Sequence, residues 1–331
     1  MLWIEKYRPE ILTDILGQDP VIQRLSSFSV SGTIPHLILT GPHGTGKSAA
    51  IECFAKALYN ENWELNTSFF QTADLFSLGK AYLEQDDRYS HLYQKNQTLI
   101  TNFKYIIKWY ASLRPLDAEF KLMVFEDAHA LTKEAQQALR RIMERTSTTC
   151  RFVFTTTNQS ALITPITSRC LPLLFSPVDQ TVMLERLRTI RESENAGSRS
   201  CSDDDLELIV QVAQGDMRRA LLLLQVALEA GRCKDLFAIA QSETANVTAS
   251  AIDALKNGEV RTAIRRLESL MIDYGLTGSE VLLEIRRITQ RDYNHPSLAI
   301  ALADAEFRIR HGNNEFVQMG AFISGIQEVF T

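Results

Sequence analysis

A glycine-rich segment near the start of the chain has the spacing of a phosphate-binding loop. It reads Gly41-Pro42-His43-Gly44-Thr45-Gly46-Lys47-Ser48. Its glycines allow backbone N–H groups to converge on phosphate oxygens at the point where a helix begins. In such a loop Lys47 reaches the β and γ phosphates, and the Ser48 hydroxyl is a ligand of Mg²⁺. The segment therefore predicts a site for ATP with Mg²⁺.

Two neighbouring carboxylates later in the chain complement this loop. Glu126 and Asp127 end the apolar run at 121–125, and acids at the carboxyl end of such a strand face the metal in phosphate-loop proteins. We expect Glu126 to hold Mg²⁺ together with Ser48, and Asp127 to orient the attacking water. Asn158, at the tip of the next predicted strand, is suited to orient the same water. The alternatives are a solvated strand end for the acidic pair and a turn residue for Asn158.

Two arginines occur in contexts suited to a phosphate. Arg169 lies in the segment Thr167-Ser168-Arg169-Cys170, although by itself it could equally be an ordinary surface residue. Arg218 follows Asp216, which is a suitable N-cap for the helix that begins there. From that position Arg218 can point back toward a γ-phosphate.

The pattern of apolar residues places these motifs on a sheet. Buried strands are predicted at 36–40, 121–125 and 150–156, and helices at 47–58 and 132–145. A plain glycine turn is the weaker interpretation of the loop, because the loop follows a predicted strand and opens a predicted helix. Strands that alternate with helices predict a parallel sheet covered on both faces, which extends to about residue 174.

The rest of the chain shows helical periodicity only. Helices are predicted at 181–192, 203–213, 217–230, 260–274, 278–290 and 295–309, with a polar loop at 193–204. A chain of this length exceeds one ordinary core, so we expect three domains. These are an α/β nucleotide-binding domain at 1–174, a small helical domain at 175–235 and an all-helical domain at 236–331.

Composition excludes several other classes of protein. The 331 residues are 45% hydrophobic and 23% charged, no apolar stretch is long enough to span a membrane, and early charges argue against a secretory signal. The five cysteines are scattered without metal-binding spacing, which favours free thiols in a reducing compartment. A net charge of -5 argues against bulk attraction to nucleic acid, but it leaves a local basic surface open.

Together these motifs resemble a small subunit of replication factor C, the clamp loader of archaea and eukaryotes. The resemblance covers nearly the whole chain, and its most specific element is the Ser-Arg-Cys triplet. It rests on the phosphate loop and on residues 3–9, 15–18, 130–141, 168–170, 215–218 and 302–316. It implies an AAA+ fold, in which the α/β domain is followed by a helical lid and an all-α collar that forms oligomers.

The resemblance also implies roles for individual residues. Arg169 would be the arginine finger, which acts on ATP bound by the neighbouring subunit. Arg218 would be the sensor arginine at the γ-phosphate of its own site, and Asn158 would be the polar sensor. The adenine and ribose side of the site would be lined by Tyr7, Arg8 and Pro9.

The activity implied by the resemblance is clamp loading. The chain would bind ATP within a pentameric hetero-oligomer of small and large subunits and help to load the sliding clamp onto primer-template DNA. We expect a divergent small-subunit paralogue from an archaeon, hence cytoplasmic and nucleoid-associated; a eukaryotic protein would be nuclear. The alternatives are a regulatory subunit with little ATP hydrolysis of its own, and a AAA+ protein that binds origins or drives branch migration.

Two segments depart from the family pattern. The family usually has Asp-Glu-Ala-Asp where this chain has Glu126-Asp127-Ala128-His129, so Asp127 is one methylene shorter than the usual catalytic Glu. A small misplacement of a catalytic group can cost on the order of 100-fold in rate, so we expect ATP binding with weakened hydrolysis. Residues 69–117 also diverge from the usual sequence, and we assign no individual DNA contacts there.

Overall fold

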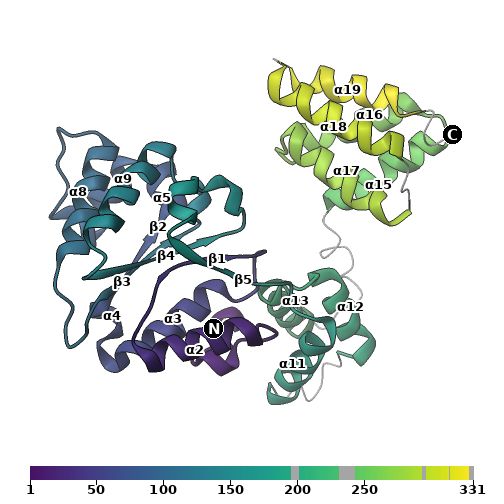
Figure 1. Ribbon diagram of the computed structural model, residues 1–331. Helices are drawn as coiled ribbons and strands as arrows, with labels where there is room; N and C mark the ends of the chain where they lie inside the picture. Colours follow the sequence, from purple (N-terminus) through teal and green to yellow (C-terminus); the bar gives the residue numbers. More distant parts are fainter. Residues whose placement is uncertain (195–200, 231–242, 293–295, 313, 328–331) are drawn as a thin grey trace. The chain divides into compact units, whose positions relative to one another are not determined.

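The computed structural model describes residues 1–194, 201–230, 243–292, 296–312 and 314–327. The chain forms two compact units, Met1–Gly231 and Arg232–Thr331 (Figure 1). None of the described helices is long and apolar enough to cross a membrane.

The first unit is built on a five-stranded parallel sheet with the strand order β2-β3-β4-β1-β5. The strands are β1 (His36–Thr40), β2 (Thr67–Gln71), β3 (Lys121–Glu126), β4 (Cys150–Thr156) and β5 (Cys170–Leu174). The predicted strands β1, β3 and β4 are confirmed. The outer strands β2 and β5 were not predicted; β5 contains Pro172, which an edge strand tolerates because one side of its backbone needs no ladder partner.

Helices cover both faces of this sheet (Figure 1), as the alternating pattern predicts. One core joins α2 (Asp19–Ser31) and α3 (Lys47–Tyr59) to the sheet, and another joins α8 (Leu99–Ser112) and α9 (Lys133–Arg145) to its opposite face. Stacked rings of Phe70, Phe125 and Phe154, with centroids 5.3 and 5.4 Å apart, cross three neighbouring strands on the second face.

Short helices connect these elements. They are α1 (Trp3–Lys6), α4 (Trp63–Asn66), α5 (Thr72–Leu78), α6 (Lys80–Gln85), α7 (Asp87–Ser90) and α10 (Thr164–Thr167), with 3₁₀ turns at Leu12–Asp14, Asn60–Asn62, Ala128–Ala130 and Gln159–Ala161.

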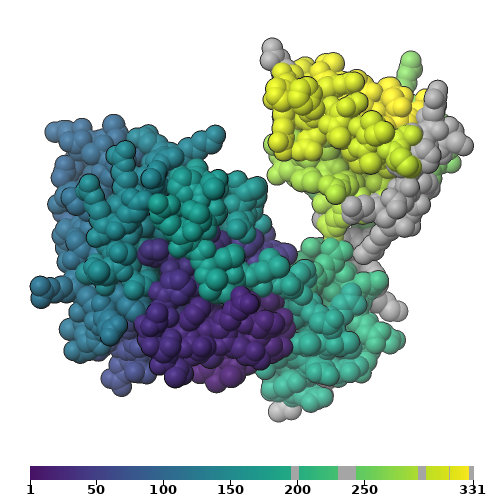
Figure 2. Space-filling view, viewed as in Figure 1, coloured from purple at the N-terminus to yellow at the C-terminus, as the bar shows by residue number. Residues whose placement is uncertain are grey.

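The helices α11 (Gln180–Ser193), α12 (Asp203–Ala213) and α13 (Met217–Ala230) follow the sheet and confirm the predicted helices to within a residue or so at each end. Part of the predicted loop at 193–204 lies outside the described residues. Helix α1 packs on α13, where Trp3 is buried and its backbone N–H donates to Gln225 Oε1 at 2.9 Å. The purple N-terminal residues accordingly lie against this helical part in Figure 2.

The described part of the second unit is helical, as predicted. Its helices are α15 (Glu243–Lys256), α16 (Val260–Ile272), α17 (Gly278–Asp292), α18 (Pro296–His311) and α19 (Glu315–Gly325). They share one core, to which Leu267, Ile285 and Phe322 belong. The predicted start of a helix at His295 and the predicted domain boundary at 235/236 lie outside the described residues. The division into three domains remains a prediction.

Candidate functional site

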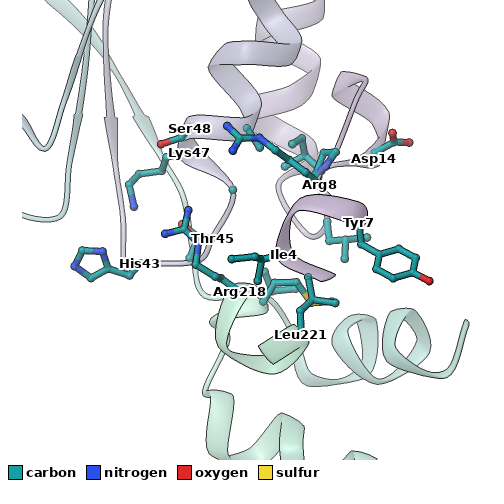
Figure 3. Close-up of a pocket in the computed structure, with 18 of the residues that line it drawn as sticks. Ile4, Tyr7, Arg8, Asp14, His43, Thr45, Lys47, Ser48, Arg218 and Leu221 are labelled. Carbon is teal, nitrogen blue, oxygen red and sulfur yellow. The ribbon is translucent and has the colours of Figure 1, made fainter. Parts of the chain in front are cut away.

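A cavity of about 560 Å³ opens where the carboxyl ends of β1 and β3 meet the helices α11 and α13 (Figure 3). Parallel strands bring their carboxyl ends to one edge of a sheet, which is where ligands bind in open α/β folds. The cavity contains most of the predicted site residues. They are Tyr7, Arg8, Pro9, His43, Gly44, Thr45, Gly46, Lys47, Ser48, Glu126, Asp127 and Arg218.

The glycine loop forms one wall of the cavity. Gly44 and Gly46 have φ angles of +66° and +95°, a region that glycine adopts without the steric cost that a Cβ brings. Helix α3 begins directly after Gly46, so its first N–H groups and its positive dipole end face the cavity. Gly41 and Pro42 lie at the base of the loop, where their carbonyls accept hydrogen bonds from Lys47 Nζ at 2.7 and 2.6 Å.

The Lys47 ammonium lies among charged groups of this site. Burial lowers its pKa, and the charge of Arg218 acts in the same direction, whereas Asp127 and Asp216 act to raise it. The glycine loop, the end of β3 and the start of α13 therefore bring four charged side chains within electrostatic reach of one another. Two of these groups, Lys47 and Arg218, are cations that can pair with the negative charge of phosphate oxygens.

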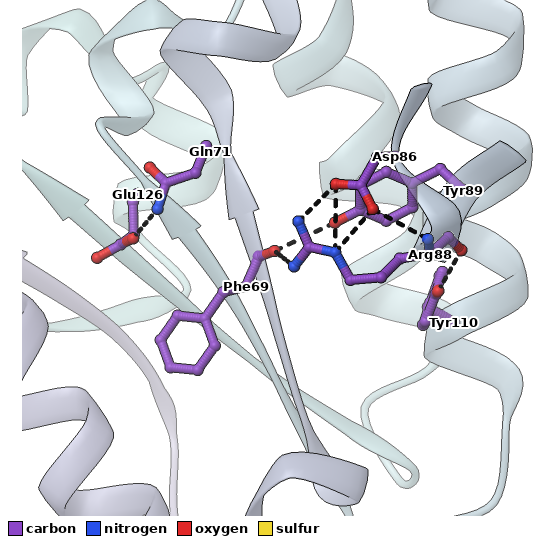
Figure 4. Close-up of polar contacts among 7 residues, drawn as sticks. All are labelled: Phe69, Gln71, Asp86, Arg88, Tyr89, Tyr110 and Glu126. Carbon is purple, nitrogen blue, oxygen red and sulfur yellow. Dashed lines mark hydrogen bonds and ion pairs between the residues drawn. The ribbon is translucent and has the colours of Figure 1, made fainter. Parts of the chain in front are cut away.

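The acidic pair ends strand β3 at the edge of the cavity. Gln71, which is paired with Glu126 in the parallel register of β2 and β3, donates a hydrogen bond from Nε2 to Glu126 Oε2 (Figure 4). This contact fixes one carboxylate oxygen of Glu126 and leaves the other available to a ligand.

Asp127 has an unusual backbone conformation, with φ 50° and ψ 46°. This left-handed conformation costs on the order of 1–2 kcal/mol for a residue with a Cβ. Neighbours hold it in place: the Thr72 hydroxyl lies 2.5 Å from Glu126 O and 2.7 Å from Asp127 O, and the Asp127 N–H donates to Thr155 Oγ1 at 3.3 Å. The chain thus maintains local strain at the residue expected to orient water.

The oxygen donors here fit Mg²⁺. Ser48, Glu126 and Asp127 all line the cavity, and Mg²⁺ is typically held by one or two carboxylates together with substrate phosphates and waters. Within the described residues no group of three or more His, Cys, Asp or Glu side chains could hold a metal by itself. Such a donor set suits a metal that arrives with a nucleotide.

Helix α13 meets the glycine loop directly. The N–H of Met217 donates to Gly44 O at 3.1 Å, and Asp216 Oδ1 caps the helix by accepting from the Arg219 N–H at 2.9 Å, so the predicted N-cap is confirmed. A Cβ on Gly44 would lie 1.7 Å from Asp216 Oδ1. The helix that carries Arg218 is therefore seated on the phosphate loop itself.

The N-terminal segment forms another wall of the cavity, but its polar ends are engaged elsewhere. Tyr7 Oη bonds to Ser193 Oγ at 3.0 Å and to Glu194, which also pairs with Lys6, so the Tyr7 ring points away from Lys47 (Figure 3). Arg8 pairs with Glu52 of α3 at 2.6 Å. The segment therefore ties α11 to the sheet domain beside the cavity.

Four predicted residues lie outside the cavity lining: Gly41 and Pro42 at the base of the loop, and Asn158 and Arg169 farther away. Asn158 caps a short 3₁₀ turn, where its Oδ1 accepts from Ser160 N at 3.0 Å and from Ser160 Oγ at 2.7 Å. Arg169, between α10 and β5, donates to Pro165 O at 2.7 Å and pairs with Glu144 at 2.6 Å. The structure thus separates Arg169 from the cavity of its own chain.

Sequence reasoning missed several residues of the site, namely Gln71, Thr72, Thr155 and Arg186. Gln71 ends β2, a strand that was not predicted, Thr72 begins the helix after it, and Arg186 lies on α11 at a position with no local signal. Thr155 was detectable in principle, because it belongs to the predicted strand that ends beside Asn158.

Known proteins resemble this chain along nearly its whole length. The replication factor C small subunit of Picrophilus torridus is 33% identical over 337 residues, covering 99% of this chain and 98% of that protein. The corresponding subunit of Archaeoglobus fulgidus is 32% identical over 331 residues, covering 98% and 96%.

Two family profiles match separate parts of the chain. Residues 17–179 match the profile described as DNA polymerase III, delta subunit, and residues 244–325 match the replication factor C C-terminal domain. The second match covers the described helices of the second unit from α15 to α19.

Solved structures establish the AAA+ fold. The Orc1 protein of Aeropyrum pernix, solved in complex with DNA, has a TM-score of 0.57 at 18% identity, covering 98% of this chain and 85% of that one. A RuvB variant of Thermotoga maritima has a TM-score of 0.53 at 15% identity, covering 89% and 91%. The fold and the full-length relatives lead to one conclusion: this chain belongs to the family of replication factor C small subunits.

Proposed function

We propose that this chain is an ATP-binding small subunit of a clamp loader, which helps to load the sliding clamp onto primer-template DNA. The observation that carries the proposal is the cavity in which Lys47 and Ser48 of the glycine loop meet the acidic pair and Arg218. The family membership supports the replication role, and the match of residues 244–325 to the replication factor C C-terminal domain disfavours an origin-binding or branch-migration protein.

The triphosphate would be held by residues from the glycine loop, the end of β3 and helix α13. Backbone N–H groups at the start of α3 would cradle the phosphates, and Lys47 would exchange the carbonyls of Gly41 and Pro42 for the β and γ oxygens. Ser48 and Glu126 would hold Mg²⁺, which neutralises charge on the phosphates. Arg218 would reach the γ-phosphate from α13, which is already seated on the loop through the Met217 N–H.

Hydrolysis depends on how Asp127 is aimed. A carboxylate that orients water must come within hydrogen-bond reach of it, about 3 Å. Asp127 is short, and its left-handed backbone re-aims the side chain, with Thr72 and Thr155 holding that conformation. This arrangement favours a regulatory subunit, which binds ATP well and hydrolyses it slowly.

Arg169 is proposed to serve the ATP of a neighbouring subunit. Its place outside its own cavity supports this role, since the guanidinium has N–H donors beyond those that contact Pro165 O and Glu144, and these can meet another chain's phosphate. The partners would be other small and large clamp-loader subunits in a pentameric hetero-oligomer, the sliding clamp and primer-template DNA. Because the relatives named above are archaeal, we place the complex on the chromosome in the cytoplasm.

The test is ATP turnover by the chain alone, and then with its partner subunits, clamp and primed DNA. We expect slow turnover alone and stimulation on assembly. Arg169→Ala should leave ATP binding by the isolated chain intact and lower turnover of the complex, whereas Arg145→Ala, at the end of α9, should change neither. If Arg169→Ala abolished binding in the isolated chain, the role in trans would be wrong.

A further inference from the structure

The guanidinium of Arg169 is held by two contacts on the surface of its own chain. Its Nη1 donates to Pro165 O at 2.7 Å, and its Nη2 lies 2.6 Å from Glu144 Oε1. The first contact comes from the short helix α10 just before Arg169, and the second comes from the last turn of α9. The side chain of Arg169 is 35% exposed and that of Glu144 is 42% exposed.

The two sides of this ion pair belong to a rigid frame. Helix α9 is fixed by the buried residues Leu139 and Met143. The backbone N–H of Arg169 donates to Ile166 O at 3.0 Å, and the next residue, Cys170, begins strand β5. The positions of both backbones are therefore set by the core, and without Glu144 the Arg169 side chain would keep only its contact with Pro165 O.

The pair is poorly placed to stabilise the fold. Ion pairs between exposed side chains contribute little to stability, because water screens them and ordering both chains costs entropy. A guanidinium has five N–H donors, and the two contacts described use one each from Nη1 and Nη2. Glu144 can thus hold Arg169 while other donors stay available to a phosphate.

The charge of Glu144 does not cancel the cationic character of this surface. Arg140, one turn earlier on α9, also contacts Glu144 Oε1, with its Nε 3.4 Å away. Two guanidinium groups therefore share one carboxylate, and the cluster keeps a net positive charge. Arg140 also limits the motion of the carboxylate that holds Arg169.

We propose that Glu144 is a positioning residue for Arg169: it holds the guanidinium in the orientation that meets the nucleotide of a neighbouring subunit. This inference rests on the proposed role of Arg169 in trans. The opposite role, restraint of Arg169 until assembly, is disfavoured because Pro165 O of α10 holds the same rotamer. The contacts from α10 and from Glu144 therefore support the same orientation, and Glu144 does not draw Arg169 out of place.

The test uses the assembled complex at saturating ATP and primed DNA. Glu144→Ala should lower turnover about two- to tenfold, because a less restrained Arg169 side chain must lose rotamer freedom when it meets the nucleotide. The half-saturating ATP concentration should not change. Glu144→Gln keeps an oxygen acceptor of the same reach and should fall between Glu144→Ala and the unmodified chain. The matched control is Glu134→Ala, which removes a carboxylate from the first turn of the same helix, where it pairs with Lys104 at 3.2 Å; turnover should not change.

A double variant separates positioning from a structural role. In an Arg169→Ala background, Glu144→Ala should cause no further loss, because the group that it positions is gone. An equal loss in both backgrounds, or unchanged or faster turnover for Glu144→Ala alone, would overturn the proposal. If Arg169→Ala itself had no effect, the role of Arg169 in trans would fail instead. Should Glu144→Ala fold poorly in a thermal melt, Glu144→Gln carries the same comparison.

Discussion

The contact between the phosphate loop and helix α13 can be tested by adding a single methyl group. Gly44 has φ +66°, and a Cβ there would lie 1.7 Å from Asp216 Oδ1 and 2.3 Å from Asp216 Cγ. Gly32, at the end of α2, has φ +67° and would meet nothing within 4 Å. Gly44→Ala and Gly32→Ala therefore impose the same backbone strain, and only Gly44→Ala disturbs the lid.

The expected cost follows from these two contributions. A Cβ in the left-handed region costs about 1–2 kcal/mol, which both variants share. In Gly44→Ala the Asp216 side chain must also move, and loss of its cap on the Arg219 N–H costs about 1 kcal/mol. Gly44→Ala should therefore lower the free energy of unfolding by about 1 kcal/mol more than Gly32→Ala. It should also weaken ATP binding, because Arg218 lies in the first turn of the helix that loses this cap.

Urea unfolding followed by tryptophan fluorescence measures this difference, since Trp3, Trp63 and Trp109 all lie in the first unit. The atoms that an added Cβ would strike belong to the Asp216 carboxylate, so Gly44→Ala should cost no more than Gly32→Ala once Asp216→Ala is present. Equal destabilisation by the two glycine variants in the unmodified chain would refute the described contact between loop and lid.

Two further predictions concern hydrolysis and pH. Asp127→Glu restores the longer arm, so turnover should rise or stay unchanged; rapid turnover in the unmodified chain that is lost in this variant would instead indicate a fully adapted Asp127. His36 accepts the Phe152 N–H at Nδ1, 3.0 Å away, and burial, aided by the charge of Arg151, lowers its pKa from 6.5 to about 4. The folded state thus binds fewer protons than the unfolded state between these values, so this stabilisation is complete above about pH 6.5 and is lost as pH falls toward 4. The loss at pH 5 should be about 1–2 kcal/mol after allowance for partial exposure. Urea midpoints at pH 7 and 5 should therefore differ less in His36→Gln than in the unmodified chain, and an identical difference would contradict the assignment.

Features set by local spacing could be predicted from the sequence. The phosphate loop and the start of α3 are specified by glycines, Lys47 and Ser48 within one short segment. The lid helices follow from the 3.6-residue apolar period, and Asp216 caps α13 because its carboxylate can reach N–H groups of the next turn. In each case the residues that determine the structure are close together in the chain.

Features set by tertiary contacts could not be predicted in this way. Gln71 reaches Glu126 only because β2 pairs with β3 in a particular register, and β2 itself lacks a clear apolar pattern. The left-handed conformation of Asp127 depends on hydroxyls from Thr72 and Thr155, which come from separate elements. No local pattern encodes such pairs.

The proposed function requires that the cavity binds ATP through the phosphate loop. The most direct measurement is a calorimetric titration of ATP with Mg²⁺ into the unmodified chain and into Lys47→Ala, with thermal melts to verify that both are folded. A charge-assisted hydrogen bond contributes about 1.5–3 kcal/mol, so Lys47→Ala should weaken binding by about 10- to 100-fold. Lys133→Ala, at the start of α9 away from the cavity lining, should bind as the unmodified chain does. Equal ATP affinity in the unmodified chain and Lys47→Ala would contradict the assignment of this cavity as the nucleotide site.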